Sequence, residues 1–348
     1  MKKLFTALAL SGGFACAAHA QSVVEIYGVA DMGFVAESSG VPTETTKLTP
    51  VNKLTSGVQS GTRLGFKGTE NLGEGMKAMF VLETGIAADA GGFAQANTAF
   101  ARQSFVGLQN DLGTLTLGRQ YTPLFNTLMV ADPFAAGMAG AAQNLMPTGG
   151  IRMNNAVKYT SPVFAGFSTE LAYGFGEAVD NSSNGQERSA AINYTANDLK
   201  VALAYNDWIQ KVVTAATATT PETITYRPNR KDWFLAANYD LKVAKIFVGV
   251  TDTDFGGVKS NDYLIGTQIP FGQHTFIASY INKNVRNAAS MDANQIALGY
   301  TYSLSNRTNL YAAWGRIDND SAAGYTVGNN SELGTGEKAF NLGVRHFF

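Results

Sequence analysis

The chain has 348 residues, of which 45% are hydrophobic and only 15% are charged, with 26 Lys and Arg against 27 Asp and Glu. The formal net charge of −1 argues against a nucleic-acid partner, which normally needs a basic face, and so many hydrophobic residues exclude a disordered chain. The 37 Gly, 21 Phe and 14 Tyr favour strands joined by turns, because aromatic side chains suit pleated surfaces and glycine suits tight connections.

The first 20 residues have the pattern of a secretory signal peptide. Lys2 and Lys3 precede an apolar stretch that ends in Ala18-His19-Ala20, an A-x-A cleavage signal. Cleavage after this signal would leave 328 of the 348 residues, change the net charge from −1 to −3 and remove Cys16, the one cysteine. The mature chain is therefore expected to have no disulfide bonds.

The rest of the chain is incompatible with membrane-spanning helices. No run beyond residue 20 approaches the roughly 18 apolar residues that such a helix needs. Two classes remain: a soluble secreted protein, or an outer-membrane barrel, in which strict alternation hides the hydropathy signal.

Alternation of apolar and polar side chains predicts strands along most of the chain, because successive side chains of a strand point to opposite faces. The clearest segments are 24–34, 62–67, 167–175, 199–206, 296–304 and 339–348.

The predicted connections alternate between short and long. Short turns are expected at 70–75, 110–113, 195–198, 270–272 and 305–307, and longer polar or glycine-rich stretches at 36–60, 87–98, 207–228 and 319–337. Outer-membrane barrels have this asymmetry, with short periplasmic turns and long extracellular loops. At roughly 20 residues for each strand and its connection, the mature chain would form about 16 strands. A secreted β-sandwich or solenoid is the alternative, although no repeat of fixed period is present.

Five segments resemble the general diffusion porins of Gram-negative outer membranes. They are VEIYGVAD at 24–31, GTRLGFKGTENLG at 61–73, GRQY at 118–121, VKYTSP at 157–162 and GVRHFF at 343–348. The resemblance implies an all-β, sixteen-stranded transmembrane barrel over residues 21–348 that lets small hydrophilic solutes and ions cross the outer membrane, without a cofactor. It also implies a homotrimer, in which loop 85–98 latches onto a neighbour. The terminal Phe348 matches the family's signal for the outer-membrane assembly machinery.

The resemblance further implies that the third external loop folds into the lumen and narrows it. This loop would lie between Tyr121 and Arg152, and its small-residue run at 135–142 could form a short helix against the wall. The expected constriction has a basic wall of Arg63, Arg102, Arg119 and Arg152, with Tyr121 beside it and Asp132 as the opposing carboxylate. Such facing charges select ions, and the excess of arginines favours anions weakly.

One of these arginines has an unfavourable position in its predicted strand. Arg119 shares parity with the apolar Leu115 and Leu117, so it reaches the lumen only if the strand ends or bulges there.

The sequence leaves three other functions to consider. A substrate-specific channel needs a ladder of lumen aromatic residues, for which Tyr27 and Tyr121 are the candidate first members, and an adhesive or structural barrel would use loops such as 207–228. An enzyme or a metal site is disfavoured, because the mature chain keeps only His274 and His346 and shows no catalytic or metal-binding motif.

Overall fold

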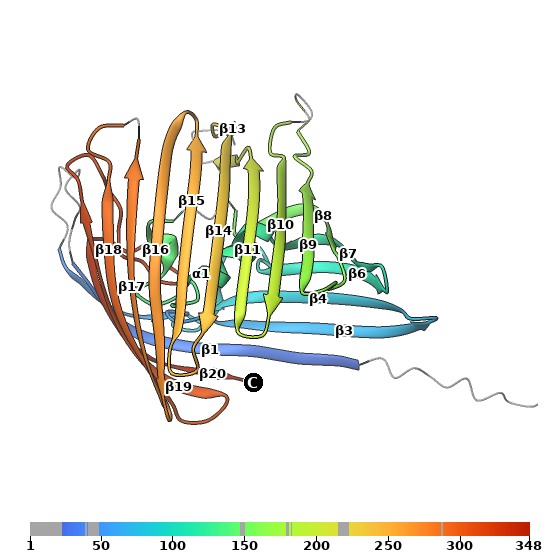
Figure 1. The fold of residues 1–348 in the computed structure, drawn as a ribbon, viewed down its shortest axis with the longest axis horizontal. Coiled ribbons are helices and arrows are strands. Elements are labelled where there is room, and N and C mark those ends of the chain that lie inside the picture. Colours follow the sequence, from blue (N-terminus) through green and yellow to red (C-terminus); the bar gives the residue numbers. More distant parts are fainter. Residues whose placement is uncertain are drawn as a thin grey trace, which may run out of the picture.

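The computed structural model describes residues 23–38, 40, 49–146, 150–178, 181, 183–214, 223–286 and 288–348. These residues form a closed antiparallel barrel of 16 strands, as the sequence predicts (Figure 1). The predicted signal peptide lies outside the described residues and stays a prediction.

The wall strands follow one another around the barrel, each paired with its neighbours. They are β1 (Val23–Glu37), β3 (Arg63–Gly73), β4 (Met76–Ala87), β6 (Gln103–Asn110), β7 (Gly113–Tyr121), β8 (Arg152–Thr160), β9 (Phe167–Gly174), β10 (Glu187–Ala196), β11 (Leu199–Trp208), β14 (Arg230–Asp240), β15 (Lys245–Phe255), β16 (Val258–Phe271), β17 (His274–Val285), β18 (Ala293–Ser303), β19 (Thr308–Asn319) and β20 (Lys338–Phe347).

Four short strands lie outside this set. β2 (Val51–Ser56) pairs with the second half of β1, and β5 (Gly92–Phe93) pairs with the last two residues of β4. The hairpin of β12 (Lys211–Thr214) and β13 (Thr223–Tyr226) forms a separate sheet within a long loop.

The alternation of the sequence places apolar side chains on the outside. On β1, for example, Ile26 is 62% exposed and Phe34 is 41% exposed, whereas Asp31 is fully buried inside. The six predicted strand segments are confirmed, and so are the short turns between strands. The turn between β3 and β4 is tighter than predicted: its two residues, Glu74 and Gly75, both have positive φ, the geometry of a two-residue hairpin turn.

The barrel closes where β1 pairs with β20 on one side and with β3 on the other. β3 and β2 pair with the same side of β1, β3 with its first half (Val23–Val29) and β2 with its second half (Met32–Glu37). The segment 57–62 between β2 and β3 leaves the β-sheet. The pairing along this side of β1 is therefore interrupted between β3 and β2, and the segment 57–62 at the interruption points into the barrel.

Asp31 of β1 holds the inward segment in position. Its carboxylate accepts hydrogen bonds from the backbone N–H of Gln59 (2.9 Å) and Ser60 (2.5 Å) and from the Tyr311 hydroxyl (2.7 Å). Its carbonyl accepts from the backbone N–H of Gly57 (2.8 Å) and the Thr62 hydroxyl (2.8 Å). One buried residue therefore binds both ends and the middle of the segment.

The third long connection, 122–151, folds into the barrel. It begins with α1 (Pro123–Ala131), which Figure 1 shows within the curve of the wall. The helix starts here because the Thr122 hydroxyl accepts from the Phe125 N–H (3.1 Å) and Pro123 takes a first-turn position where its missing N–H is no loss. A single turn of 3-10 helix, η1 (Ala142–Asn144), follows later.

The prediction that the small-residue run 135–142 forms the helix is wrong. Ala135, Ala136 and Met138 have positive φ, so the chain turns repeatedly there. The cause is Asp132, whose carboxylate accepts from the backbone N–H groups of Phe134 (2.8 Å), Ala136 (2.8 Å) and Ala142 (2.9 Å). The run wraps around this carboxylate instead of forming helical hydrogen bonds.

Polar side chains of four wall strands and of the connection between β19 and β20 hold the loop by its backbone carbonyls. The donors are Asn238 to Val130 (2.7 Å), Gln268 to Pro133 (2.5 Å), Lys283 to Leu145 (3.0 Å), Gln295 to Gly140 (3.3 Å) and Asn330 to Ala136 (2.8 Å). Because buried carbonyls are costly without a partner, the wall must supply such donors wherever the loop touches it.

The loop also contacts the inward segment and the small residues of the wall. The Met138 N–H donates to the Val58 carbonyl (2.7 Å), and a Cβ on Gly137 would stand 2.0 Å from the Gln59 carbonyl oxygen. On the opposite wall, a Cβ on Gly266 would meet Pro133 at 2.6 Å, and one on Gly299 would meet Phe134 at 2.6 Å. Glycine is required at these positions because the loop lies directly against the sheet.

The main hydrophobic core lies between the loop and the wall. Leu124, Leu128 and Phe134 of the loop are at most 2% exposed, and they share a cluster with Phe234 and Ile281 of the wall. The lumen is therefore divided into a packed part behind the loop and an open part in front of it.

We expect Asp31→Ala to lower the free energy of unfolding by about 3 kcal/mol, because it leaves buried N–H and hydroxyl groups without their charged acceptor. It should also raise the single-channel conductance, since the inward segment that supports the loop is released. Urea unfolding in detergent and planar-bilayer recording would measure the two effects, with Asp111→Ala in an exposed turn as the control. An unchanged conductance in a destabilised variant would show that the loop does not depend on this segment.

Burial raises the pKa of Asp132 to about 6, although three backbone N–H groups favour the charged form. The ordinary value is 3.8, so between about pH 4 and pH 6 the folded protein binds more protons than the unfolded chain. Relative to Asp132→Asn, the wild type should therefore gain stability as the pH falls from 7 to 4, by up to about 3 kcal/mol. Unfolding free energies of both proteins over this range would test the sign, and a loss of relative stability on acidification would contradict it.

Candidate functional site

The open part of the lumen has an arginine cluster centred on Tyr121, the last residue of β7. The Tyr121 hydroxyl accepts hydrogen bonds from Arg102 Nη2 (2.7 Å) and Arg152 Nη2 (3.3 Å). The Arg152 guanidinium also lies 4.9 Å from the centre of the Tyr121 ring, which stacks on Phe125 with 5.1 Å between the ring centres. A loop residue, Phe125, thus fixes the ring that carries two arginines.

Glu83 is the carboxylate inside this cluster. Its Oε1 accepts from Arg102 Nε (2.8 Å), and its Oε2 accepts from the Tyr27 hydroxyl (3.0 Å). Glu83 is only 3% exposed, so its charge is offset locally by Arg102 and does not project into the pore. Arg63, at the start of β3, interacts electrostatically with both Arg102 and Glu83.

Arg119 reaches the lumen by way of a β-bulge. The pairing of β7 with β8 shifts register between Gly118 and Gln120, and Gly118 has a φ of +129°. The side chain is then fixed by hydrogen bonds from Nε to the Ala101 carbonyl (2.6 Å) and from Nη1 to Asn154. The alternation of the sequence requires a bulge here if Arg119 is to face the lumen, and the structure has this bulge. Arg119 then interacts electrostatically with Arg152.

The structure adds Arg345 of β20 to the cluster. Its Nη1 donates to the Ser60 hydroxyl (2.9 Å), its Nε donates to Asn309 (3.0 Å), and it interacts electrostatically with Arg63. Sequence reasoning did not select it, although its parity in the last strand places it with Asn341 on the inner face. Electrostatic interactions between neighbours link five arginines, which we call the arginine row: Arg345, Arg63, Arg102, Arg152 and Arg119.

Asp132 does not oppose these arginines. It is 2% exposed and its carboxylate is bound to backbone N–H groups inside the loop. The expectation that it supplies the negative side of the constriction is therefore wrong. Among the described residues of loop 122–151 there is no other Asp or Glu, so the loop presents no carboxylate to the row.

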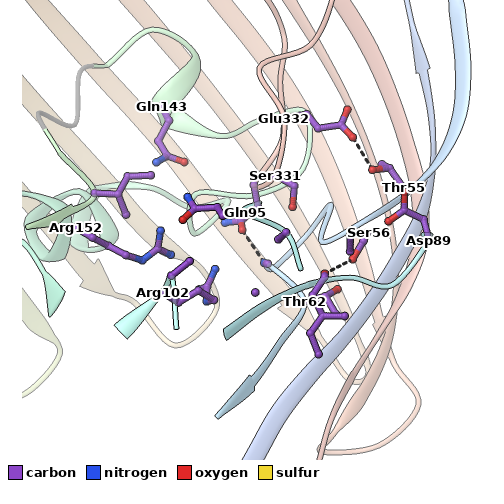
Figure 2. A pocket seen from close by; sticks show the side chains of 18 of the residues that line it. Thr55, Ser56, Thr62, Asp89, Gln95, Arg102, Gln143, Arg152, Ser331 and Glu332 are labelled. Carbon is purple, nitrogen blue, oxygen red and sulfur yellow. Dashed lines mark hydrogen bonds between the residues drawn. The ribbon is translucent and has the colours of Figure 1, made fainter. Parts of the chain in front are cut away.

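The negative side comes instead from two external loops. A cavity of about 330 Å³ lies in the lumen, and Figure 2 shows Arg102 and Arg152 on one side of it and Glu332 and Asp89 on the other. Glu332 accepts from the Thr55 hydroxyl (2.6 Å) and pairs with Lys53. Burial alone would raise the pKa of Glu332, but these hydrogen bonds hold it below its ordinary value, so this group is charged at neutral pH.

The charge balance across the cavity favours the arginines. Lys53 pairs with both Glu332 and Glu37 (2.9 Å), so it offsets one of these two negative charges, and elsewhere on the wall Lys158 is offset by Glu170 at 2.5 Å. Asp89 is an exposed loop residue in contact with solvent, which screens its charge. Within the row, the single negative charge of Glu83 offsets one of the five arginines, so this part of the wall keeps a net positive charge.

The described residues contain no group of three or more His, Cys, Asp or Glu side chains that could hold a metal ion. Within the same residues, no helix has both the length and the apolar character required to span a membrane.

Comparison with known proteins agrees with this geometry. The family model described as Gram-negative porin matches residues 6–322. An outer membrane porin protein of Bordetella pertussis is 30% identical, over 90% of this chain and 93% of the relative, and outer membrane porin protein 32 of Delftia acidovorans is 31% identical over the full length of both.

Solved structures give the same result. The anion-selective porin from Comamonas acidovorans has a TM-score of 0.77 and 28% identity, with 94% of this chain and 100% of that chain covered. OmpT of Vibrio cholerae in its trimer form has a TM-score of 0.70 at 16% identity, with 94% and 99% covered, which concerns the fold alone. The barrel, the inward loop and these similarities together show that the chain belongs to the Gram-negative porin family.

Proposed function

We propose that the protein is a passive diffusion channel of the outer membrane for small hydrophilic solutes and ions, with a weak preference for anions. The observation that carries the proposal is the row of five arginines in the lumen, to which the described residues of the inward loop 122–151 present no exposed carboxylate. A fixed positive wall in a narrow pore attracts anions and repels cations, and the effect acts over roughly 8–10 Å at physiological salt. The anion-selective relative from Comamonas acidovorans supports the same sign.

A sugar-specific channel and a catalytic role are less well supported than a general diffusion channel. An aromatic ladder for sugars would need free ring faces, whereas the Tyr27 hydroxyl is bound to Glu83 and the Tyr121 ring lies between Arg152 and Phe125. No catalytic role is proposed, since the family and the relatives are porins.

The assembly is proposed from the family resemblance. A homotrimer would place the predicted latch, loop 85–98, against a neighbour, and the exposed Phe93 of this loop (58%) suits such a contact. The proposal also includes a cleaved signal peptide at residues 1–20 and recognition of the terminal Phe348, which is 51% exposed, by the assembly machinery.

The experiment that tests the channel proposal is the reversal potential in planar bilayers under a salt gradient. The double variant Arg63→Ala/Arg119→Ala should shift the potential toward cations, by about two- to fivefold in permeability ratio for each arginine, because two of the five wall charges are lost. The double variant Arg227→Ala/Arg307→Ala removes the same net charge from exposed positions outside the lumen and is the matched control. Equal potentials for the two double variants would refute the role of the arginine wall.

Glu83→Gln should move the reversal potential further toward anions, because it removes the carboxylate of the cluster and leaves Arg102 uncompensated. A shift of about two- to fivefold in permeability ratio is expected. Glu25→Gln, on an exposed carboxylate paired with Lys67, is the control. A shift toward cations would mean that Glu83 orders the arginines more than it offsets them.

A further inference from the structure

A groove of about 360 Å³ lies on the outer face of the barrel, over β8–β11. It faces the membrane, since Glu187, Ser189 and Ala191 of β10 are buried inside, whereas Arg188 and Ile192, at alternate positions of the same strand, are exposed outside. The residues that line it are Val157, Tyr159, Leu171, Ala172, Tyr173, Arg188, Ser189, Ala190 and Tyr205. With one exception, Arg188, its outward-facing side chains are apolar or aromatic.

The groove exists because one side chain in this part of the wall is small. Ala190 is the cross-strand partner of Leu171 on β9 and of Tyr205 on β11, so a methyl group stands between two large side chains. Tyr205 is held from its far side by Trp233, at 4.7 Å between ring centres. Empty apolar space loses dispersion contacts, and in a bilayer the surrounding acyl chains are available to fill it.

Positive charge lies at one end of the groove. Arg188 is next to the start of β10, directly after the connection 175–186, and this is the extracellular end of the strand if long connections are external. Its Nη2 donates to Gln186 (3.2 Å), which leaves further N–H donors of the guanidinium for a ligand. In the same outward row, Asp207 is paired across strands with Arg188 and with Lys231, so two cations flank one carboxylate.

We propose that this groove binds a phosphate-bearing lipid of the outer leaflet, with one acyl chain over Ala190 and the phosphate on Arg188. The guanidinium forms charge-assisted hydrogen bonds with phosphate oxygens, and Lys231 adds attraction at longer range. The proposal rests on the position of the barrel in the membrane and is independent of what passes through the pore.

Fluorescence quenching by brominated lipids tests the proposal, with Trp233 as the reporter beside the groove. Trp208 and Trp314, the other two tryptophans, are replaced by Phe. The refolded protein is placed in phosphatidylcholine vesicles that contain either brominated phosphatidylglycerol or brominated phosphatidylcholine. The anionic lipid should quench Trp233 with about fivefold higher apparent affinity than the zwitterionic lipid.

Two variants separate the headgroup site from the chain site. Arg188→Ala should abolish the difference between the two lipids, and Ala190→Phe should reduce quenching by both, because the ring fills the groove. Arg307→Ala and Ala237→Phe, the latter on the outer face of β14, are the matched controls and should behave like the parent. Wild-type conductance in every variant would show that the barrel is folded.

Equal quenching by both lipids in the parent would overturn the phosphate site, and unchanged quenching in Ala190→Phe would overturn the groove. A second copy of the chain is the competing occupant. Tyr205→Cys in protein refolded from residues 21–348 carries no other cysteine, so efficient disulfide dimers in vesicles would identify this face as a protein contact and also overturn the proposal.

Discussion

The geometry of the pore depends on the hydrogen bonds of one buried carboxylate, that of Asp31. These bonds pull the segment 57–62 out of the β-ladder and into the barrel, where its carbonyl at Val58 receives the N–H of Met138 from the loop. Ser60 of the same segment accepts from Arg345, so the anchor of the loop and the end of the arginine row share one support. An interruption of the wall, which would be a defect in an ordinary sheet, here supports both the inward loop and the arginine row.

The arginines and the carboxylates of the lumen are held by different kinds of partner. Apart from Arg102, which pairs with Glu83, the arginines are fixed by neutral groups, including the Tyr121 hydroxyl, the Ala101 carbonyl and Asn309, so the row keeps a net positive charge. Among the carboxylates near them, Asp132 is bound by backbone N–H groups of the loop, and Glu332 shares the cation Lys53 with Glu37. The net charge of the arginine row therefore depends on which groups are neutralised nearby, and the overall net charge of the chain has little influence on it.

Much of the barrel could be predicted from the sequence, because period-two alternation is a local signal that each strand carries by itself. The same parity correctly indicated that Arg119 needs a bulge, and the bulge is present at Gly118. The interior of the loop could not be predicted, since its conformation is set by partners far away in the chain, such as Asn330 for Ala136. The role of Asp132 was misjudged for the same reason: an isolated carboxylate in a loop looks available until its backbone partners are known.

The attachment of the loop also has a consequence for biogenesis. The wall residues that hold its carbonyls all follow it in the chain, from Asn238 on β14 to Asn330 beyond β19. The narrow zone therefore cannot reach its final shape while the carboxyl-terminal third of the barrel is absent, however complete the loop itself is. The fixed loop and the complete barrel are therefore products of the same last step of folding.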